Sequence, residues 1–184
     1  FNHCSRGFFQ FNDILENGTN SPWLSWFHIQ GWPLAPYDGR RNANYVGWAN
    51  NRALPKFNTD DPNVREFLMN VGEYWVRQFD IDGWRLDVPT EITTPGFWEE
   101  FRERARAIKP DLYIVGEIWP AAPEWLLGDR FDATMNYLFT SAAIAFCAGD
   151  RVSQKLVEDR SYNPFPGIDA AEFDNRIQQL LGCY

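Results

Sequence analysis

The stretch "DGWRLDVPTEI", residues 82–92, has the pattern of a β-strand that ends in a carboxylate. Side chains of a strand alternate between its two faces, so Arg85 and Asp87 share one face. The residues between them, such as Leu86, form the opposite, apolar face, which suits packing against helices. We therefore predict a strand over 79–88, with Asp87 at its carboxyl end.

Helical and strand patterns alternate after residue 60. Asp61 and Pro62 predict a helix start, with a capping carboxylate followed by proline at the first helical position. Apolar residues at helical spacing extend this helix to residue 78. The other expected elements are a helix opening at Thr94 and ending before Pro110, a buried strand over 112–118, a short helix over 122–127, a strand over 130–135, a helix over 137–148, a loop from 151 and a helix from Ala170 to Leu181.

Strands separated by single helices indicate βα units and a parallel sheet, in either a doubly wound fold or a (β/α)8 barrel. No glycine-rich phosphate loop follows a predicted strand, which weakens the doubly wound, nucleotide-binding alternative. A full barrel takes about 250 residues, so the 184 residues hold only part of one. Residues 4–59 are rich in Gly, Pro, Asn and Asp and predict an irregular excursion, with short strands in "WLSWFHI", residues 23–29.

Composition argues against several classes of function. The net charge is −8 without a basic block, and no apolar run approaches the length of a membrane helix, so neither nucleic acid nor membrane is an expected partner. Cys4, Cys147 and Cys183 lack the spacing of a disulfide framework or zinc site. With only His3 and His28, a histidine-based metal site or a serine triad is poorly supported.

Two carboxylates end neighbouring predicted strands. Arg85 can hold Asp87 ionised and in one rotamer, although an isolated pair of this kind more often only ties strands together. Glu117 ends "YIVGE" one βα unit later, where Trp119 and apolar neighbours would favour the protonated acid. Two carboxyl groups in different environments form the pattern that cleaves glycosidic bonds.

Four motifs occur in order along the chain: "FNH" (1–3), "LPKFN" (54–58), "GWRLDVPTE" (83–91) and "GEIW" (116–119). Together they resemble the α-amylase family of glycoside hydrolases (family 13). The stretches "SPWLSWFHI" and "GDRFDATMNYLFT" are most similar to its neopullulanase, cyclomaltodextrinase and maltogenic amylase branch.

This resemblance implies an α/β fold that is a partial (β/α)8 TIM barrel, a fragment of the catalytic domain. Residues 1–3 would end barrel strand 3, residues 4–59 would form the domain inserted after it, and residues 60–184 would supply βα units 4 to 6 with the preceding helix. The fragment would stop in the helix region before strand 7.

The resemblance also implies a hydrolase that cleaves α-glucosidic bonds of maltooligosaccharides, cyclodextrins, pullulan or starch by a retaining double displacement. It gives Asp87 the role of nucleophile, Glu117 that of general acid, and Arg85 that of orienting the nucleophile. His3 would bind the sugar being cleaved, and Glu91 would act on the acceptor side.

Two departures from the family pattern limit these expectations. Thr90 stands where the branch usually has asparagine, so acceptor preference stays open. The family's third catalytic aspartate belongs to a His-Asp motif that this chain lacks, so the 184 residues alone are expected to be inactive. No cofactor is required. Asn2 matches a position that binds calcium in some members, but no metal is assigned.

Three alternatives remain within this interpretation. The enzyme could be an α-1,6-glucosidase or a trehalose-forming isomerase of the same family, against which "LPKFN" and "DVPTE" argue mildly. It could also be a non-catalytic sugar-binding relative, although such proteins are expected to lose the carboxylates. The expected partner is an α-glucan. The oligomeric state is open, and the branch resemblance and cysteine usage slightly favour the cytoplasm.

Overall fold

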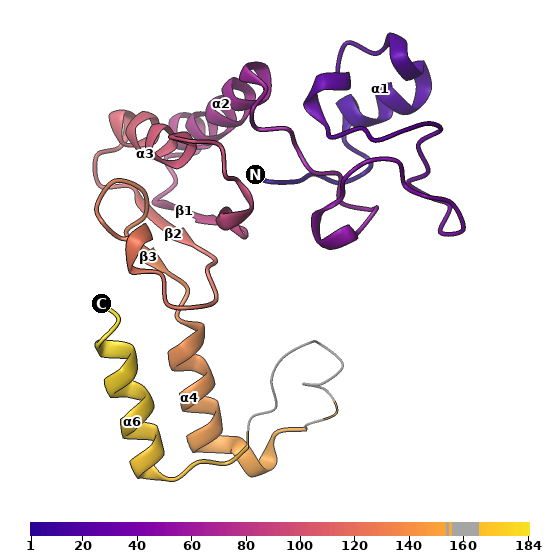
Figure 1. The fold of residues 1–184 in the computed structure, drawn as a ribbon. Helices are drawn as coiled ribbons and strands as arrows, with labels where there is room; N and C mark the ends of the chain where they lie inside the picture. Colours follow the sequence, from indigo (N-terminus) through magenta and orange to yellow (C-terminus); the bar gives the residue numbers. More distant parts are fainter. Residues whose placement is uncertain (154, 156–165) are drawn as a thin grey trace. The chain divides into compact units, whose positions relative to one another are not determined.

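The computed structural model describes residues 1–153, 155 and 166–184 (Figure 1). These residues form two compact units, Phe1–Ile114 and Val115–Tyr184. The expected boundary between residues 59 and 60 stays a prediction. The loop expected from residue 151 lies partly outside the described residues.

The core of the first unit is a pair of packed helices, α2 (Pro62–Phe79) and α3 (Phe97–Ile108). As predicted, α2 begins at Pro62, and the Asp61 carboxylate accepts hydrogen bonds from two backbone N–H groups of the first turn. The helices bury one stripe each: Val64, Leu68, Met69, Gly72 and Val76 on α2, and Phe97, Trp98, Phe101 and Ala105 on α3.

Helix α3 begins later than the expected start at Thr94. The Thr94 hydroxyl donates to Asp60 Oδ1 at 2.6 Å instead of capping the helix. Gly96 occupies the N-cap position with φ +69°, a left-handed conformation that glycine adopts without strain. A tertiary contact therefore displaced the predicted helix start.

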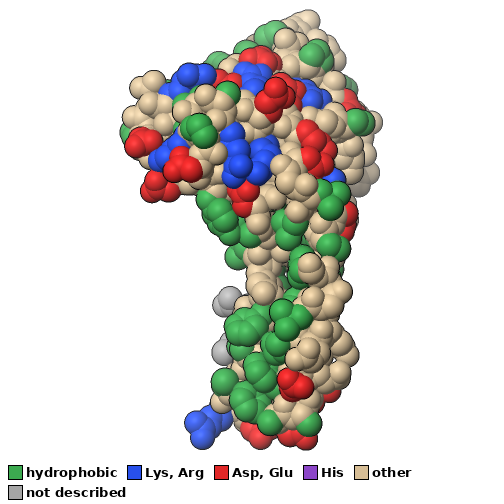
Figure 2. Space-filling view, turned by 90° about the vertical axis from the view of Figure 1, so that its left-hand side faces the viewer, with side chains coloured by type: hydrophobic (Ala, Val, Ile, Leu, Met, Phe, Trp, Pro, Cys, Tyr) green, Lys and Arg blue, Asp and Glu red, His purple; other side chains and the backbone are tan. Residues whose placement is uncertain are grey.

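Charged side chains join α2 and α3 at their surface. The Arg104 guanidinium of α3 contacts Glu66 Oε2 at 2.7 Å and also binds Glu73, both on α2. It further contacts Glu100 of its own helix at 3.2 Å. Figure 2 shows acidic and basic side chains interleaved over the part of the molecule where these helices lie. A network of this kind holds two helices together better than an isolated surface pair.

Three strands, β1 (Gly83–Leu86), β2 (Tyr113–Gly116) and β3 (Ala133–Thr134), form a parallel sheet in the order β1-β2-β3. Within β1, Arg85 is exposed and Leu86 is buried, which is the predicted alternation of faces. All three strands are shorter than predicted. The α/β class with a parallel sheet is confirmed.

The region between residues 4 and 59 is irregular but contains a helix that the sequence did not predict, α1 (Phe9–Asn17). This helix buries Phe11 and Ile14 completely. The short strands expected in "WLSWFHI" are wrong in part, because Leu24–Trp26 is a 3-10 turn and only isolated bridges follow it.

The two ends of this irregular region are held together by backbone hydrogen bonds. The Cys4 N–H donates to the Pro55 carbonyl at 3.0 Å, and the Phe57 N–H donates to the Asn2 carbonyl at 2.9 Å. Residues widely separated in sequence therefore meet next to the start of the chain.

The second unit is built on two packed helices, α4 (Tyr137–Ala148) and α6 (Ala170–Leu181), both at the predicted positions. The rings of Phe146 and Phe173 stack between them at 4.8 Å. The short helix expected over 122–127 is a 3-10 turn, Pro123–Trp125. Figure 2 shows hydrophobic side chains gathered over these helices.

Candidate active site

Asp87 follows β1 directly and is held by the arginine that shares its face of the strand. Arg85 Nη1 donates to Asp87 Oδ1 at 2.7 Å. The two side chains are 43% and 47% exposed. This exposure distinguishes the pair from a buried structural ion pair, because a ligand can reach the carboxylate.

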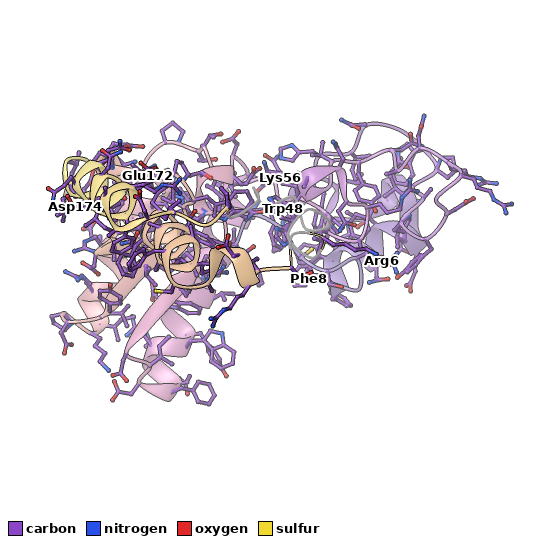
Figure 3. All side chains as sticks on the ribbon, turned by 90° about the horizontal axis from the view of Figure 1, so that it is seen from below. Arg6, Phe8, Trp48, Lys56, Glu172 and Asp174 are labelled. Atoms are coloured by element: carbon purple, nitrogen blue, oxygen red, sulfur yellow. The ribbon has the colours of Figure 1, made fainter. Side chains whose placement is uncertain are left out.

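His3 lies beside the same carboxylate. Its Nε2 is 4.0 Å from Asp87 Oδ2, too far for a direct hydrogen bond. The imidazole stacks on the Trp48 ring, with centroids 5.3 Å apart; Trp48 is labelled in Figure 3. Burial lowers the pKa of His3, and the negative charge of Asp87 acts in the opposite direction. The net direction favours a neutral ring at neutral pH.

Glu91 forms an ion pair with a residue of the "LPKFN" motif. Lys56 Nζ lies 2.7 Å from Glu91 Oε2, and the backbone of Lys56 forms an antiparallel β-bridge with that of His3; Lys56 is labelled in Figure 3. Both side chains line a cavity of about 540 Å³, together with His28, Asp60 and others of the first unit. Three of the four motifs thus meet within one unit, around polar groups that can bind hydroxyls.

Glu117 belongs to the second unit and follows β2 directly. The Tyr137 hydroxyl of α4 donates to its Oε1 at 2.9 Å. Trp119, expected to crowd this carboxyl group, is 55% exposed, and its ring centroid lies 6.5 Å from that of Tyr137. Glu117 itself is half-buried, beside a hydroxyl donor of its own unit.

The structure brings His3, Arg85 and Asp87 together in the first unit and joins Glu91 to them through Lys56. Sequence reasoning did not single out the roles of Lys56, Trp48 and Tyr137, and it considered Asn2 only for calcium. The motif "LPKFN" could have indicated Lys56, because Lys56 is its charged residue.

Two classes of feature are absent from the part of the chain that the structure describes. Among residues 1–153, 155 and 166–184, no group of three or more His, Cys, Asp or Glu side chains could hold a metal ion. In the same residues, no helix is long and apolar enough to cross a membrane.

Comparison with known proteins identifies the family to which this chain belongs. Residues 1–165 match the family described as alpha amylase, catalytic domain. The chain therefore belongs to the α-amylase family of glycoside hydrolases. Its relatives in this family imply that it is part of a (β/α)8 barrel domain.

The relatives of this chain fall in the predicted branch of the family. It is 48% identical over 163 residues to a maltogenic alpha-amylase of Bacillus acidopullulyticus, covering 88% of this chain and 27% of the relative. It is 48% identical over 184 residues to a cyclomaltodextrinase of Geobacillus thermopakistaniensis, covering 100% of this chain and 28% of that protein. The predicted family and branch are confirmed, and the chain spans little more than a quarter of these relatives' length.

A solved structure agrees closely with the fold. The native Nostoc punctiforme debranching enzyme is 60% identical in sequence and superposes with a TM-score of 0.92. The match covers 100% of this chain and 38% of that structure.

Proposed function

We propose that the full-length protein is a retaining glycoside hydrolase that cleaves α-glucosidic bonds of maltooligosaccharides, cyclodextrins, pullulan or starch. The observation that carries this proposal is the exposed Asp87 carboxylate at a strand end, held by Arg85 at 2.7 Å and facing His3. A guanidinium keeps a carboxylate ionised and oriented, as a nucleophile requires.

The proposed reaction has two steps. In the first, Asp87 attacks the anomeric carbon, the glycosidic C–O bond breaks, and Glu117 donates its proton to the leaving oxygen. In the second, Glu117 removes a proton from water, which attacks the same carbon and releases Asp87. Two inversions give net retention of configuration. The steps balance without a cofactor, so dialysis against a chelator is expected to leave the rate unchanged.

The test is to trap the covalent intermediate in the full-length protein. An activated fluorinated glucosyl donor, whose intermediate hydrolyses slowly, should add one glycosyl mass to the peptide that contains Asp87. The Asp87→Asn variant should gain none and still bind the glucan, because the fold of the site is kept. An inverted product seen by proton NMR, or wild-type protein that binds without turnover, would contradict the proposal.

A second candidate concerns the bond that is cleaved. The 60% identity to the Nostoc punctiforme debranching enzyme favours a preference for branch points, as in the α-1,6-glucosidase alternative. Rates on a linear maltooligosaccharide, on pullulan and on a branched oligosaccharide would decide between them. A rate on the branched substrate at least ten times that on the linear one would establish this preference.

A further inference from the structure

Asn2 is a buried polar residue, 1% exposed, behind the proposed site. Its Nδ2 donates to the backbone carbonyls of Asp87, at 3.1 Å, and Val88, at 3.5 Å. Carbonyl oxygens only accept hydrogen bonds, so the carboxamide nitrogen must face them. The carboxamide oxygen therefore faces the other way, where it lies 2.5 Å from His3 Nδ1.

This orientation decides the tautomer of His3. Because Asn2 Oδ1 can only accept, His3 Nδ1 must carry the hydrogen. In a neutral imidazole, the other nitrogen, Nε2, is then a hydrogen-bond acceptor. Nε2 is the atom that faces Asp87 Oδ2 at 4.0 Å. Two acceptors side by side favour a ligand that brings a donor, such as a sugar hydroxyl.

The backbone after Asp87 is strained where Asn2 holds it. Val88 has φ +33° and ψ +59°, in the left-handed region that a β-branched residue rarely adopts. Such a conformation persists only when its surroundings hold it in place. The two hydrogen bonds from Asn2 fix the carbonyls on both sides of this turn.

We propose that Asn2 is a positioning residue that holds His3 in the Nδ1–H tautomer and fixes the backbone at Asp87, so that the sugar site presents acceptors to a substrate hydroxyl. This inference rests on the proposed function, because it takes Asp87 as the nucleophile. Asn2 acts through His3 and Asp87, without a contact of its own to the reacting atoms.

Three charged side chains already act on His3. Asp87 and Glu91 raise its pKa, whereas Lys56 lowers it. A carboxylate in place of the carboxamide would accept from Nδ1–H as Asn2 does, but it would lose both donations to the backbone carbonyls and add a negative charge against the ring. The Asn2→Asp variant should therefore stabilise protonated His3, whose Nε2–H can no longer accept from a hydroxyl.

The first experiment measures the tautomer without using activity. In full-length protein labelled with ¹⁵N-histidine, the His3 signal is identified by its loss in His3→Gln. Wild type should show Nδ1 protonated and Nε2 unprotonated above about pH 7, and Asn2→Ala should show a mixture of tautomers. A wild-type ring protonated at Nε2 instead would overturn the proposal, whatever the enzyme's activity.

The second experiment measures kcat/KM against pH for wild type, Asn2→Asp and Asn2→Ala. On the acid side of the profile, the acid limb, Asn2→Asp should raise the pH at which kcat/KM falls by about one unit, as a neighbouring charge does. Asn2→Ala should lower kcat/KM about tenfold or more, as the loss of a buried hydrogen-bonding partner does, with little movement of the limb. A loss of rate and thermal stability in both variants with unmoved limbs would mean that Asn2 is only structural. If no glucan is turned over but the NMR result holds, the proposed function fails and the tautomer assignment stands.

Discussion

The helices of the two units differ in how much of their surface the unit itself buries. In the first, α2 and α3 cover each other, and each buries a continuous apolar stripe. In the second, α6 buries no residue, and α4 buries only Ala142 and Ala145. Yet α4, "YLFTSAAIAFCA", has no charged residue at all. A helix that is apolar on every side belongs in a protein interior, so α4 needs more cover than α6 provides.

The largest predicted effects are losses of catalytic rate, and they should differ between variants of the two units. Asp87→Asn in the first unit should lower kcat by several orders of magnitude for every substrate, because no covalent step remains. Glu117→Gln in the second should lower kcat/KM as much for natural glucans but far less for activated aryl glucosides, because kcat/KM reports the first step and their leaving groups need little protonation. Steady-state kinetics on both substrate types measures this.

Tyr137→Phe is the matched control for the second unit. It keeps Glu117 and removes only the hydroxyl that donates to its Oε1. We expect a loss of up to about tenfold, in line with the loss of one hydrogen bond. Equal losses in Glu117→Gln for both substrate types would show that Glu117 is not the acid.

The next largest difference should be in packing energy. Phe101 of α3 is 2% exposed, so Phe101→Ala should lower the free energy of unfolding by about 3–5 kcal/mol. Phe146 of α4 is 44% exposed in its own unit, where Phe146→Ala removes mainly one ring stack, about 0.5–1.5 kcal/mol, and any further cover of α4 would add to this cost. Chemical denaturation of the full-length protein measures both. Equal costs would mean that other parts of the protein bury Phe146.

A smaller effect should come from the close approach of α2 and α3. A Cβ at Gly72 would lie 2.5 Å from a ring carbon of buried Phe101. Gly72→Ala gains up to about 1 kcal/mol in helix propensity, but overpacking costs about 1–3 kcal/mol. We expect net destabilisation, measured by thermal unfolding. Gly39→Ala, with no atom within 4 Å, is the control and should be neutral.

The smallest predicted difference concerns thiol reactivity. Burial raises the pKa of the Cys4 thiol in the first unit to about 12, whereas Cys147 in the second is exposed. The thiolate is the reactive form. Iodoacetamide near pH 8 should therefore label Cys147 first, and Cys4 only after denaturation. Peptide mass spectrometry follows the order of labelling, and early labelling of Cys4 would show that the first unit opens readily.

The sequence predicted the elements whose signals are local. Asp61 and Pro62 marked the start of α2 because capping depends on neighbouring residues. Helix α1 was missed because "FQFNDILEN" mixes aromatic and polar residues of modest helix propensity. Its stability comes from the burial of Phe11 and Ile14, which depends on the distant chain.

In the site, too, the sequence predicted local features but not contacts between distant residues. The face shared by Arg85 and Asp87 follows from strand alternation, and the 2.7 Å contact agrees with it. Contacts between distant residues, such as Lys56 with Glu91 and Tyr137 with Glu117, carry no periodic signal. They exist only once the chain has folded.

The pairing of Asn2 and Cys4 with Phe57 and Pro55 bears on how such proteins can diversify. It brings the ends of the intervening segment together, and the cost of closing a loop rises only slowly with its length. Evolution or an engineer could therefore exchange that segment for a longer or shorter one without moving His3. Trp48 would travel with the exchanged segment, whereas Asp87 would stay. The ring that covers His3 could thus be replaced while His3 and Asp87 themselves are inherited unchanged.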